Sequence, residues 1–267
     1  MSSLGMAATD GWVVTKRNLT KIKRVPDLLV FSTIQPIMFV LLFAYVFGSA
    51  IKVNGVNYRE YLMAGIFTQT VAFGAAITAI GLAEDLQRGV IDRFRSLPMS
   101  RAGVLLGRTT SDLLNNVLVV FVMSICGLLV GWRIHTDPLR AIGGFALMFG
   151  FAYAMSWISA TIGLSVKSVE VAQSAGFIWM FPLTFLSNAF IPTDNLPTVL
   201  RKVADWNPIS SIVLTLRDLW GNSALGQARG TGFPARHPLL LSILWIVAIL
   251  AVFLPLSIAK YRRAASR

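Results

Sequence analysis

The sequence predicts an all-α integral membrane protein with six transmembrane helices, and three observations support this prediction. Hydrophobic residues make up 55% of the 267 residues and charged residues only 13%, a balance that the surface of a soluble domain of this size cannot accommodate. Six apolar runs are each long enough to cross a hydrocarbon layer of ~30 Å as a helix. Basic residues gather mostly in the short segments between these runs. A helix satisfies its backbone hydrogen bonds within one segment, so each run is expected to be helical.

The first 27 residues are expected to form a cytoplasmic N-terminal arm. They carry seven charged residues and no apolar core of the signal-peptide type, so the first span is expected to be retained. Residues 10–25 fit an interfacial helix with Trp12 and Ile22 in the lipid and the lysines outward. A mobile basic tail is the alternative interpretation.

The spans follow the arm within a single domain that covers residues 1–267. The fourth run exceeds the length that a bilayer needs, so we expect it to tilt or to extend beyond the lipid. Prolines at positions 36, 182 and 255 are expected to kink the first, fifth and sixth spans. The predicted spans are 28–50, 60–82, 110–131, 139–166, 171–191 and 238–259.

The distribution of lysine and arginine predicts the orientation of the spans. The segments before span one, between two and three, between four and five, and after six hold 15 of the 24 basic residues. The other side holds nine, five of them in the long segment 192–237. An even number of spans puts both termini on one side, and the positive-inside rule makes that side the cytoplasm. The net charge of +12 therefore indicates contact with anionic lipid, and we expect no nucleic-acid partner.

The sequence offers no catalytic or metal site. The two histidines, His135 and His237, lie in predicted outer loops without a cluster of cysteines or carboxylates. The lone cysteine, Cys126, lies inside an apolar run and is expected to pack there. Gly-Leu-Ser at 163–165 lacks the glycine that closes a nucleophile elbow. We therefore expect this chain not to be an enzyme by itself and to hold no cofactor or metal.

The energy source of a transporter can also be inferred from the sequence. None of the six runs has an ionisable residue near its centre, which argues against coupling to an ion gradient. Asp112 lies near the cytoplasmic start of span three and fits a helix-start residue. The chain contains no Gly-x-x-x-x-Gly-Lys-[Ser/Thr] phosphate loop. If ATP drives transport, it is therefore hydrolysed on another polypeptide.

Residues 84–97, between spans two and three, are predicted to form a short amphipathic helix in the cytoplasm. Leu86, Val90, Phe94 and Leu97 recur at helical spacing, and Pro98 is a natural stop. The dense mixed charge fits a surface that docks a soluble protein, whereas a helix resting on lipid headgroups is the alternative. The candidate residues for coupling to an ATPase are Glu84, Asp85, Arg88, Asp92, Arg93, Phe94 and Arg95.

Several motifs occur in an order that is specific to one family. They are Glu60-Tyr61-Leu62-Met63-Ala64-Gly65-Ile66, Glu84-Asp85-Leu86-Gln87-Arg88-Gly89, Arg93-Phe94-Arg95-Ser96-Leu97-Pro98-Met99-Ser100-Arg101, Ile191-Pro192, Leu196-Pro197, Trp206-Asn207-Pro208-Ile209 and Leu216-Arg217. In this order they resemble the permeases of ABC-2 type (type V) exporters, and most of all the daunorubicin-resistance-type permeases of actinobacteria. The resemblance covers about residues 10–262.

The resemblance implies an assembly and a mechanism. Such permeases form a homodimer or a pseudo-symmetric pair in the bacterial plasma membrane. They dock two cytoplasmic ABC ATPase subunits through the helix after span two, which matches residues 84–97. ATP and Mg would be bound by those partner subunits, and the substrate would exit by alternating access. The family also has short re-entrant outer helices, which match residues 192–220; a surface helix folded onto the spans is the alternative.

The resemblance also places the substrate pathway along spans two and five, near the dimer axis. Aromatic and methionine side chains with a few polar groups suit bulky amphipathic ligands. Packing or lipid contact is the alternative role for such a stripe. The candidate pathway residues are Phe67, Gln69, Thr70, Phe73, Phe177, Met180, Phe181, Thr184, Phe185 and Asn188.

These observations predict the permease subunit of an ATP-driven exporter for an amphipathic drug, antibiotic or lipid-like molecule. One alternative is a permease for a polysaccharide or glycolipid, which shares the fold. Another is a channel-like or scaffold membrane protein without an ATPase. The substrate itself, homodimer or heterodimer assembly, and export against import stay open at this point.

Overall fold

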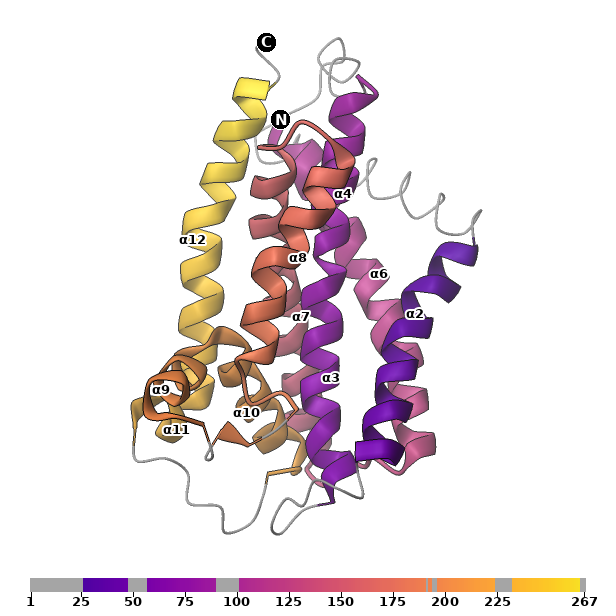
Figure 1. Ribbon diagram of the computed structural model, residues 1–267, viewed down its shortest axis with the longest axis vertical. Coiled ribbons are helices and arrows are strands. Elements are labelled where there is room, and N and C mark those ends of the chain that lie inside the picture. Colours follow the sequence, from indigo (N-terminus) through magenta and orange to yellow (C-terminus); the bar gives the residue numbers. More distant parts are fainter. Residues whose placement is uncertain are drawn as a thin grey trace.

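The computed structural model describes residues 26–47, 57–89, 101–190, 192–193, 196–223 and 232–264. Over these residues the chain is a bundle of helices with no β-strand (Figure 1). The predicted interfacial helix 10–25 lies outside the described residues. The all-helical membrane fold that the sequence predicts is confirmed.

The long helices run between the two ends of the bundle, and three short helices gather at one end (Figure 1). The long elements are α2 (Pro26–Leu41) with the π-helical η1 (Leu42–Phe47), α3 (Tyr58–Gly74), α4 (Ala76–Gln87), α6 (Arg101–Val130), α7 (Pro138–Gly163), α8 (Val169–Phe185) and α12 (Pro238–Ala264). The short elements are α9 (Thr198–Trp206), α10 (Pro208–Trp220) and α11 (Phe233–Arg236).

Among the described residues, four stretches of helix are long and apolar enough to cross a membrane, and they coincide with predicted spans two, three, four and six. They are Tyr58–Gln87, Gly103–Val130, Pro138–Gly163 and Pro238–Arg263. Predicted span one corresponds to the shorter apolar helix Thr33–Val46. Predicted span five corresponds to α8, which has 17 residues.

The helix ends differ from the predicted span limits at three places where polar contacts occur. Span two continues as helix to Gln87, and α6 begins at Arg101, nine residues before the predicted start of span three. Both extensions carry charged side chains that pair with one another between the helices. Span five was expected to reach residue 191, but α8 ends at Phe185 and residues 186–190 leave the helix.

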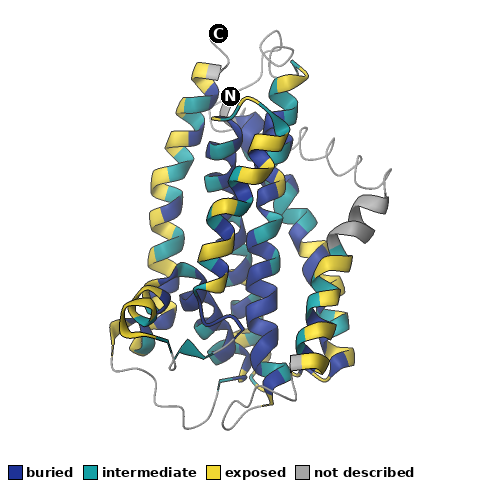
Figure 2. Cartoon of the chain, viewed as in Figure 1, coloured by how far each residue is buried: buried dark blue, intermediate teal, exposed yellow. Residues whose placement is uncertain are grey.

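The centre of the bundle is α3 with α4, joined through Ala75. Residues 61–69 of α3 are all buried (Figure 2), as expected for a helix that is packed on every side. α3 contacts α2, α6, α7, α8 and α10, and α4 contacts α7 and α8. In contrast, α2 and α12 lie at opposite edges of the bundle (Figure 1) and expose much of their apolar surface, which suits contact with lipid.

The short outer helices are built onto the bundle by an aromatic cluster. The ring of Phe67 on α3 lies 5.3 Å from the ring of Trp132 and 5.5 Å from that of Trp220 on α10. Trp132 donates an Nε1–H bond of 2.9 Å to the side chain of Asn222. Gly144 on α7 makes room for this cluster, since a Cβ there would lie 2.5 Å from Nε1 of Trp220. The buried apolar side chains of α10 therefore pack on the spans.

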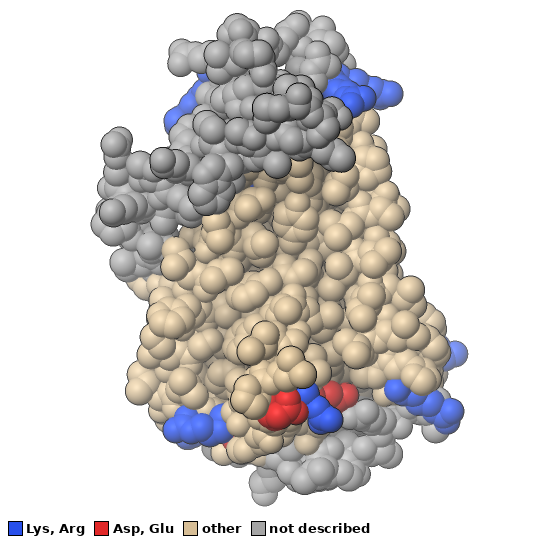
Figure 3. Space-filling model, turned by 180° about the vertical axis from the view of Figure 1, so that it is seen from behind, with Lys and Arg blue, Asp and Glu red and all other residues tan. Residues whose placement is uncertain are grey.

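Charged residues mark the two ends of the bundle. Figure 3 shows lysine and arginine side chains at both ends of one face, acidic side chains at one of these ends, and a broad belt without charged side chains between. The segments that the sequence assigns to one side meet at one end, where Gln87 donates to the Lys167 carbonyl (3.3 Å) and Lys260 to Ser165 Oγ (2.5 Å). At the other end His135 lies 2.9 Å from Glu60. The belt has the form of a membrane-embedded surface.

Candidate functional site

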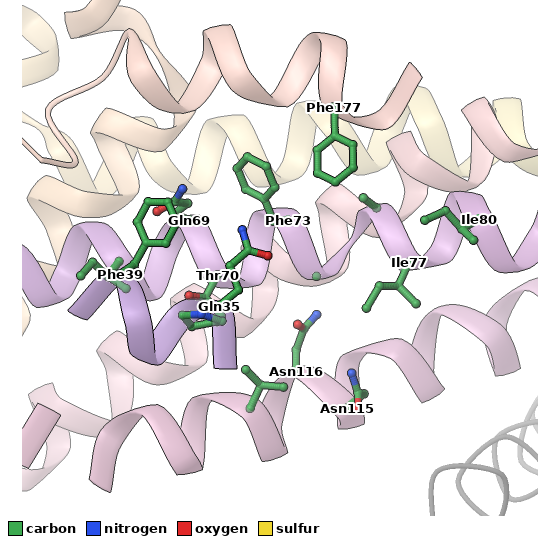
Figure 4. Close-up of a pocket in the computed structure, with 15 residues that line it drawn as sticks. Gln35, Phe39, Gln69, Thr70, Phe73, Ile77, Ile80, Asn115, Asn116 and Phe177 are labelled. Carbon is green, nitrogen blue, oxygen red and sulfur yellow. The ribbon is translucent and has the colours of Figure 1, made fainter. Parts of the chain in front are cut away.

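A cavity of about 180 Å³ lies between α2, α3, α4, α6 and α8 (Figure 4). Phenylalanine rings and uncharged polar groups share its wall, and none of its described lining residues is charged. The residues that line it are Gln35, Pro36, Phe39, Ile66, Gln69, Thr70, Phe73, Gly74, Ala76, Ile77, Ile80, Asn115, Asn116, Val119 and Phe177. Such a wall can bind an aromatic, amphipathic molecule through ring contacts and hydrogen bonds.

Helix spacing places the polar groups on the cavity side. Gln69, Thr70 and Phe73 follow one another around a single turn of α3, and the neighbouring Asn115 and Asn116 face them from α6 (Figure 4). Gly74 allows this approach, because a Cβ there would lie 2.1 Å from the side-chain oxygen of Asn116.

The structure brings together four of the ten candidate pathway residues at this cavity. Gln69, Thr70, Phe73 and Phe177 line it. Phe67 does not: it is fully buried in the aromatic cluster with the two tryptophans. The assignment of Phe67 to a pathway wall therefore has no support in the cavity geometry.

Of the other five candidate pathway residues, four lie on α8 and one follows it. Met180 and Thr184 are fully buried in the core, whereas Phe181 and Phe185 are about half exposed on the face of α8. Asn188 lies after the helix, in the non-helical stretch 186–190, and is buried there. These five residues lie outside the cavity wall.

Two helices that line the cavity, α2 and α6, were not predicted from the sequence to contribute to it. Gln35 and Phe39 come from α2, and Asn115 and Asn116 come from α6. The sequence did contain an indication of these residues. Polar side chains such as Asn115, Asn116 and Gln35 cost free energy in lipid unless they face a polar partner or a cavity.

A continuous series of phenylalanine rings runs from the cavity to the end of the bundle that carries α9, α10 and α11; we call it the outer end, because the sequence predicts that these segments lie on the outer side. Phe73 stacks edge-on against Phe181 at 5.4 Å between centroids. From Phe181 the series continues to the outer end and returns along α2, with neighbouring centroids 4.8–5.9 Å apart. The members of this phenylalanine series are Phe39, Phe43, Phe73, Phe177, Phe181, Phe185 and Phe190. Its rings give a soft apolar surface that links the cavity to the outer end.

The coupling candidates that the structure describes, Glu84, Asp85 and Arg88, lie at the opposite end of the bundle from the short helices. Glu84, Asp85 and Arg88 belong to the last turn of α4 and the turn that follows it, and Glu84 pairs with Arg88 at 2.5 Å. The separate helix expected to begin at residue 84 does not begin there, because α4 continues to Gln87 and Gly89 then takes a φ of 63°. The other coupling candidates, Asp92, Arg93, Phe94 and Arg95, lie outside the described residues.

One coupling candidate faces the neighbouring helix. Asp85 lies 3.7 Å from Nη1 of Arg108 on α6, and Arg108 Nε lies 3.3 Å from the carboxylate of Asp112. Thr78 of α4 donates a 2.7 Å hydrogen bond to the same carboxylate. We call Asp85, Arg108 and Asp112 the α4–α6 ion cluster. Sequence reasoning took Asp112 for a helix-start residue, although its i,i+4 spacing to Arg108 was a usable signal.

The described residues hold no group of three or more histidine, cysteine or acidic residues that could bind a metal. His135 pairs with one carboxylate, Glu60, across 75 residues of sequence. This contact ties the loop after α6 to the start of α3 and has the character of a structural bond.

An apolar bundle with a cavity within it and an ion cluster at one end defines a polytopic membrane transport protein. The chain belongs to the ABC-2 type transporter family, whose model matches residues 9–219. Membership makes it a membrane permease, a transport subunit and not itself an enzyme, of a family that works with an ABC ATPase.

The named relatives include permeases of drug resistance and of O-antigen export. The chain is similar to the daunorubicin resistance ABC transporter permease protein DrrB1 of Streptomyces coeruleorubidus, with 29% identity over 92% of this chain and 83% of the relative. It is also similar to the probable doxorubicin resistance ABC transporter permease protein DrrC of Mycobacterium tuberculosis, with 22% identity over 94% and 88%. The O-antigen export system permease protein RfbA of Klebsiella pneumoniae is 26% identical over 94% of this chain and 92% of its own length.

Proposed function

We propose that this chain is the permease subunit of an ATP-binding-cassette exporter that moves an amphipathic drug, antibiotic or lipid-like molecule out of a bacterial cell. The observation that carries this proposal is the cavity between α2, α3, α4, α6 and α8, with three phenylalanines, five uncharged polar side chains and no charged residue in its described wall. Aromatic rings offer stacking area, and the amides fix the orientation of a guest.

The proposed assembly follows the family. Two copies of the permease form a homodimer in the bacterial plasma membrane, with both termini in the cytoplasm. Two ABC ATPase subunits bind at the end that carries Glu84, Asp85 and Arg88, and those subunits hold ATP and Mg. The chain is proposed as a single domain. Membership in the family favours this assembly over a channel or scaffold that has no ATPase.

A polysaccharide or glycolipid is the second candidate substrate, since one relative is named for O-antigen export. A sugar chain is expected to need a continuous channel lined by aromatic residues, whereas this cavity is compact, with a volume of about 180 Å³. The geometry therefore supports the amphipathic substrate better.

The first experiment is affinity purification of the tagged chain from its native membrane in mild detergent, with mass spectrometry and an ATPase assay. A stoichiometric partner that contains a phosphate loop and hydrolyses ATP is the expected result. Recovery of the chain alone under gentle extraction would contradict the proposed assembly.

The second experiment tests the cavity with daunorubicin as the probe. The purified complex in lipid vesicles is expected to show ATPase activity stimulated by daunorubicin. Asn116→Leu removes one amide from the wall and is expected to raise the half-stimulating concentration about tenfold, because one buried hydrogen bond is lost. Phe121→Leu is the matched control on the same helix, since Phe121 is 64% exposed. Equal effects of the two substitutions would contradict the assignment of the cavity.

A further inference from the structure

The five residues that follow α8 form a non-helical stretch at the outer end of the bundle, and the last four of them are buried. We call residues 186–190 the outer plug. Ser187, Asn188, Ala189 and Phe190 are each less than a tenth exposed, although the backbone there is no longer helical. Such a backbone needs hydrogen-bond partners from elsewhere when water is excluded.

Side chains of α10 and its cap supply part of these bonds. Asn207, which caps the start of α10, donates from its side-chain amide to the carbonyls of Leu183 and Leu186, both at 2.7 Å. The backbone N–H of Asn188 donates to Ser210 Oγ at 3.1 Å. Within the plug, the backbone N–H of Ala189 donates to Ser187 Oγ, and from α3 the hydroxyls of Tyr58 and Tyr61 donate to the carbonyls of Phe190 (3.3 Å) and Asn188 (3.5 Å). Beyond Leu186 the plug is thus held mainly by side chains and not by a helical ladder of its own.

Arg217 makes the central connection. Its side chain is almost fully buried on α10, and its Nη2 donates to the carbonyls of Asn188 (3.0 Å) and Ala189 (3.2 Å). Its Nε donates to the Tyr61 carbonyl on α3 at 3.0 Å, and the guanidinium lies 3.3 Å from the centroid of the Tyr61 ring. One cation therefore connects α10, the plug and α3 through charge-assisted bonds, which are the stronger kind.

The plug is pressed against α3 at a glycine. A Cβ on Gly65 would lie 1.9 Å from the carbonyl oxygen of Ala189, so no other residue fits without moving the plug. Phe190 of the plug is also the outermost link of the phenylalanine series, 5.8 Å from Phe185 and 4.8 Å from Phe43. The plug therefore closes the outer end of that series.

Two buried polar groups in this closed arrangement lack hydrogen-bond partners within the described part of the chain. The side-chain oxygens of Asn188 and Thr184 are buried without a hydrogen-bond partner among the described residues. An unmet buried acceptor costs free energy in this state, and a state in which the plug moves can relieve it.

We infer that the outer plug is the exit gate of the permease and that Arg217 is the positioning residue that holds the gate closed. This inference rests on the proposed export function. Because side chains hold the plug, it can move by exchanging a few hydrogen bonds while α8 and α10 stay folded. In the open state Arg217 keeps its bond to the Tyr61 carbonyl and releases the two plug carbonyls.

A reversible cross-link tests the gate in the complete complex with its ATPase. In a Cys126→Ser background, the pair Asn188→Cys with Ser210→Cys ties the plug to α10, at positions already joined by the 3.1 Å bond. Oxidation is expected to lower ATP-driven daunorubicin transport in vesicles at least about tenfold, and reduction to restore it. The matched control is Thr215→Cys with Ser242→Cys, which ties α10 to α12 where the two hydroxyls are 3.0 Å apart.

The control cross-link is expected to leave transport within about twofold, because α10 stays on α12 in both states. Undiminished transport with the plug fully cross-linked would overturn the inference, and so would equal inhibition by the two pairs. The reduced forms and the unsubstituted chain must first transport daunorubicin. If these forms do not transport daunorubicin, the proposed substrate class is contradicted. The gate is then tested by a measurement that needs no substrate.

That measurement is labelling of a single Asn188→Cys by a membrane-impermeant maleimide added from the outer side. Trapping the ATPase with vanadate and ATP is expected to raise the labelling rate about tenfold, and adding Arg217→Gln to raise it without nucleotide. Arg140→Gln is the control, since Arg140 is a solvent-exposed arginine at the same end. Labelling that neither nucleotide nor Arg217→Gln changes would overturn the gate while leaving the export proposal intact.

Discussion

Asp85 on α4 and Arg108 on α6 form an ion pair of 3.7 Å between two neighbouring helices of the bundle. Both side chains are largely shielded, with 23% and 17% of their surface exposed. The carboxylate therefore points at α6, and a docked ATPase would contact the exposed neighbours Glu84 and Arg88 first. The ion pair holds the end of α4 in register with α6.

Removal of the cation from the α4–α6 ion cluster is predicted to destabilise the protein. Arg108→Gln leaves Asp85 and Asp112 without their shared partner, which is expected to cost about 1–3 kcal/mol. The measurement is the thermal midpoint of the detergent-solubilised chain, followed by tryptophan fluorescence. Arg140→Gln, in an exposed pair with Asp137, is expected to cost less than about 0.5 kcal/mol. A similar midpoint for both variants would show that the cluster contributes nothing to stability.

Gly81→Ala is predicted to disturb the same cluster without any change of charge. A Cβ at position 81 would lie 1.8 Å from Nη2 of Arg108, so the guanidinium has to leave its place. Gly143→Ala on α7 is the matched control, because a Cβ there meets nothing within 4 Å. We expect a lower thermal midpoint for Gly81→Ala and an unchanged or slightly higher one for Gly143→Ala, since alanine favours helix. The reverse order would be incompatible with the packing at Gly81.

Glu84→Lys is predicted to weaken ATPase docking while leaving the stability of the permease almost unchanged. The Glu84–Arg88 pair is exposed, so its loss is expected to change the unfolding free energy by less than about 0.5 kcal/mol. If this end docks the ATPase, the reversed charge weakens the complex and lowers ATPase stimulation several-fold. Co-purification of the two subunits at graded salt measures the effect. Full recovery of the complex would place the docking contacts elsewhere.

Phe67 and Phe73 are predicted to respond differently to the same substitution. Phe67→Leu removes a ring from the aromatic cluster and is expected to lower stability by about 1–2 kcal/mol with little effect on half-stimulation by daunorubicin. Phe73→Leu changes the cavity wall and is expected to raise the half-stimulating concentration more than it lowers stability. Measuring both quantities on both variants tests whether Phe67 acts in packing or in the substrate pathway.

The fold could be predicted from the sequence largely because length and hydropathy determine where a helix can cross lipid. The end of α8 could not, because it depends on Asn207, which is 21 residues further on and donates to the carbonyl of Leu186. Periodicity along one helix contains no information about such a partner. The same limit explains why span five was expected to reach residue 191.

The cavity was half predictable for a related reason. Gln69, Thr70, Phe73 and Phe177 belong to the two spans that the family resemblance indicated, whereas Asn116 comes from a third. A polar side chain in an apolar helix indicates that a polar partner or a cavity lies beside it, but the sequence does not show which helix supplies that partner. Gly74, which admits Asn116, shows its role only when α3 and α6 are seen side by side.

The uncharged wall of the cavity has an electrical consequence. Because none of its described lining residues carries a charge, movement of this wall displaces no protein charge through the membrane field. One elementary charge moved across 100 mV corresponds to about 2.3 kcal/mol, so the membrane potential acts here only on the charge of the cargo. A neutral compound in this cavity would therefore add no charge of its own to the transport step, while a monovalent cation would be carried outward against the resting potential.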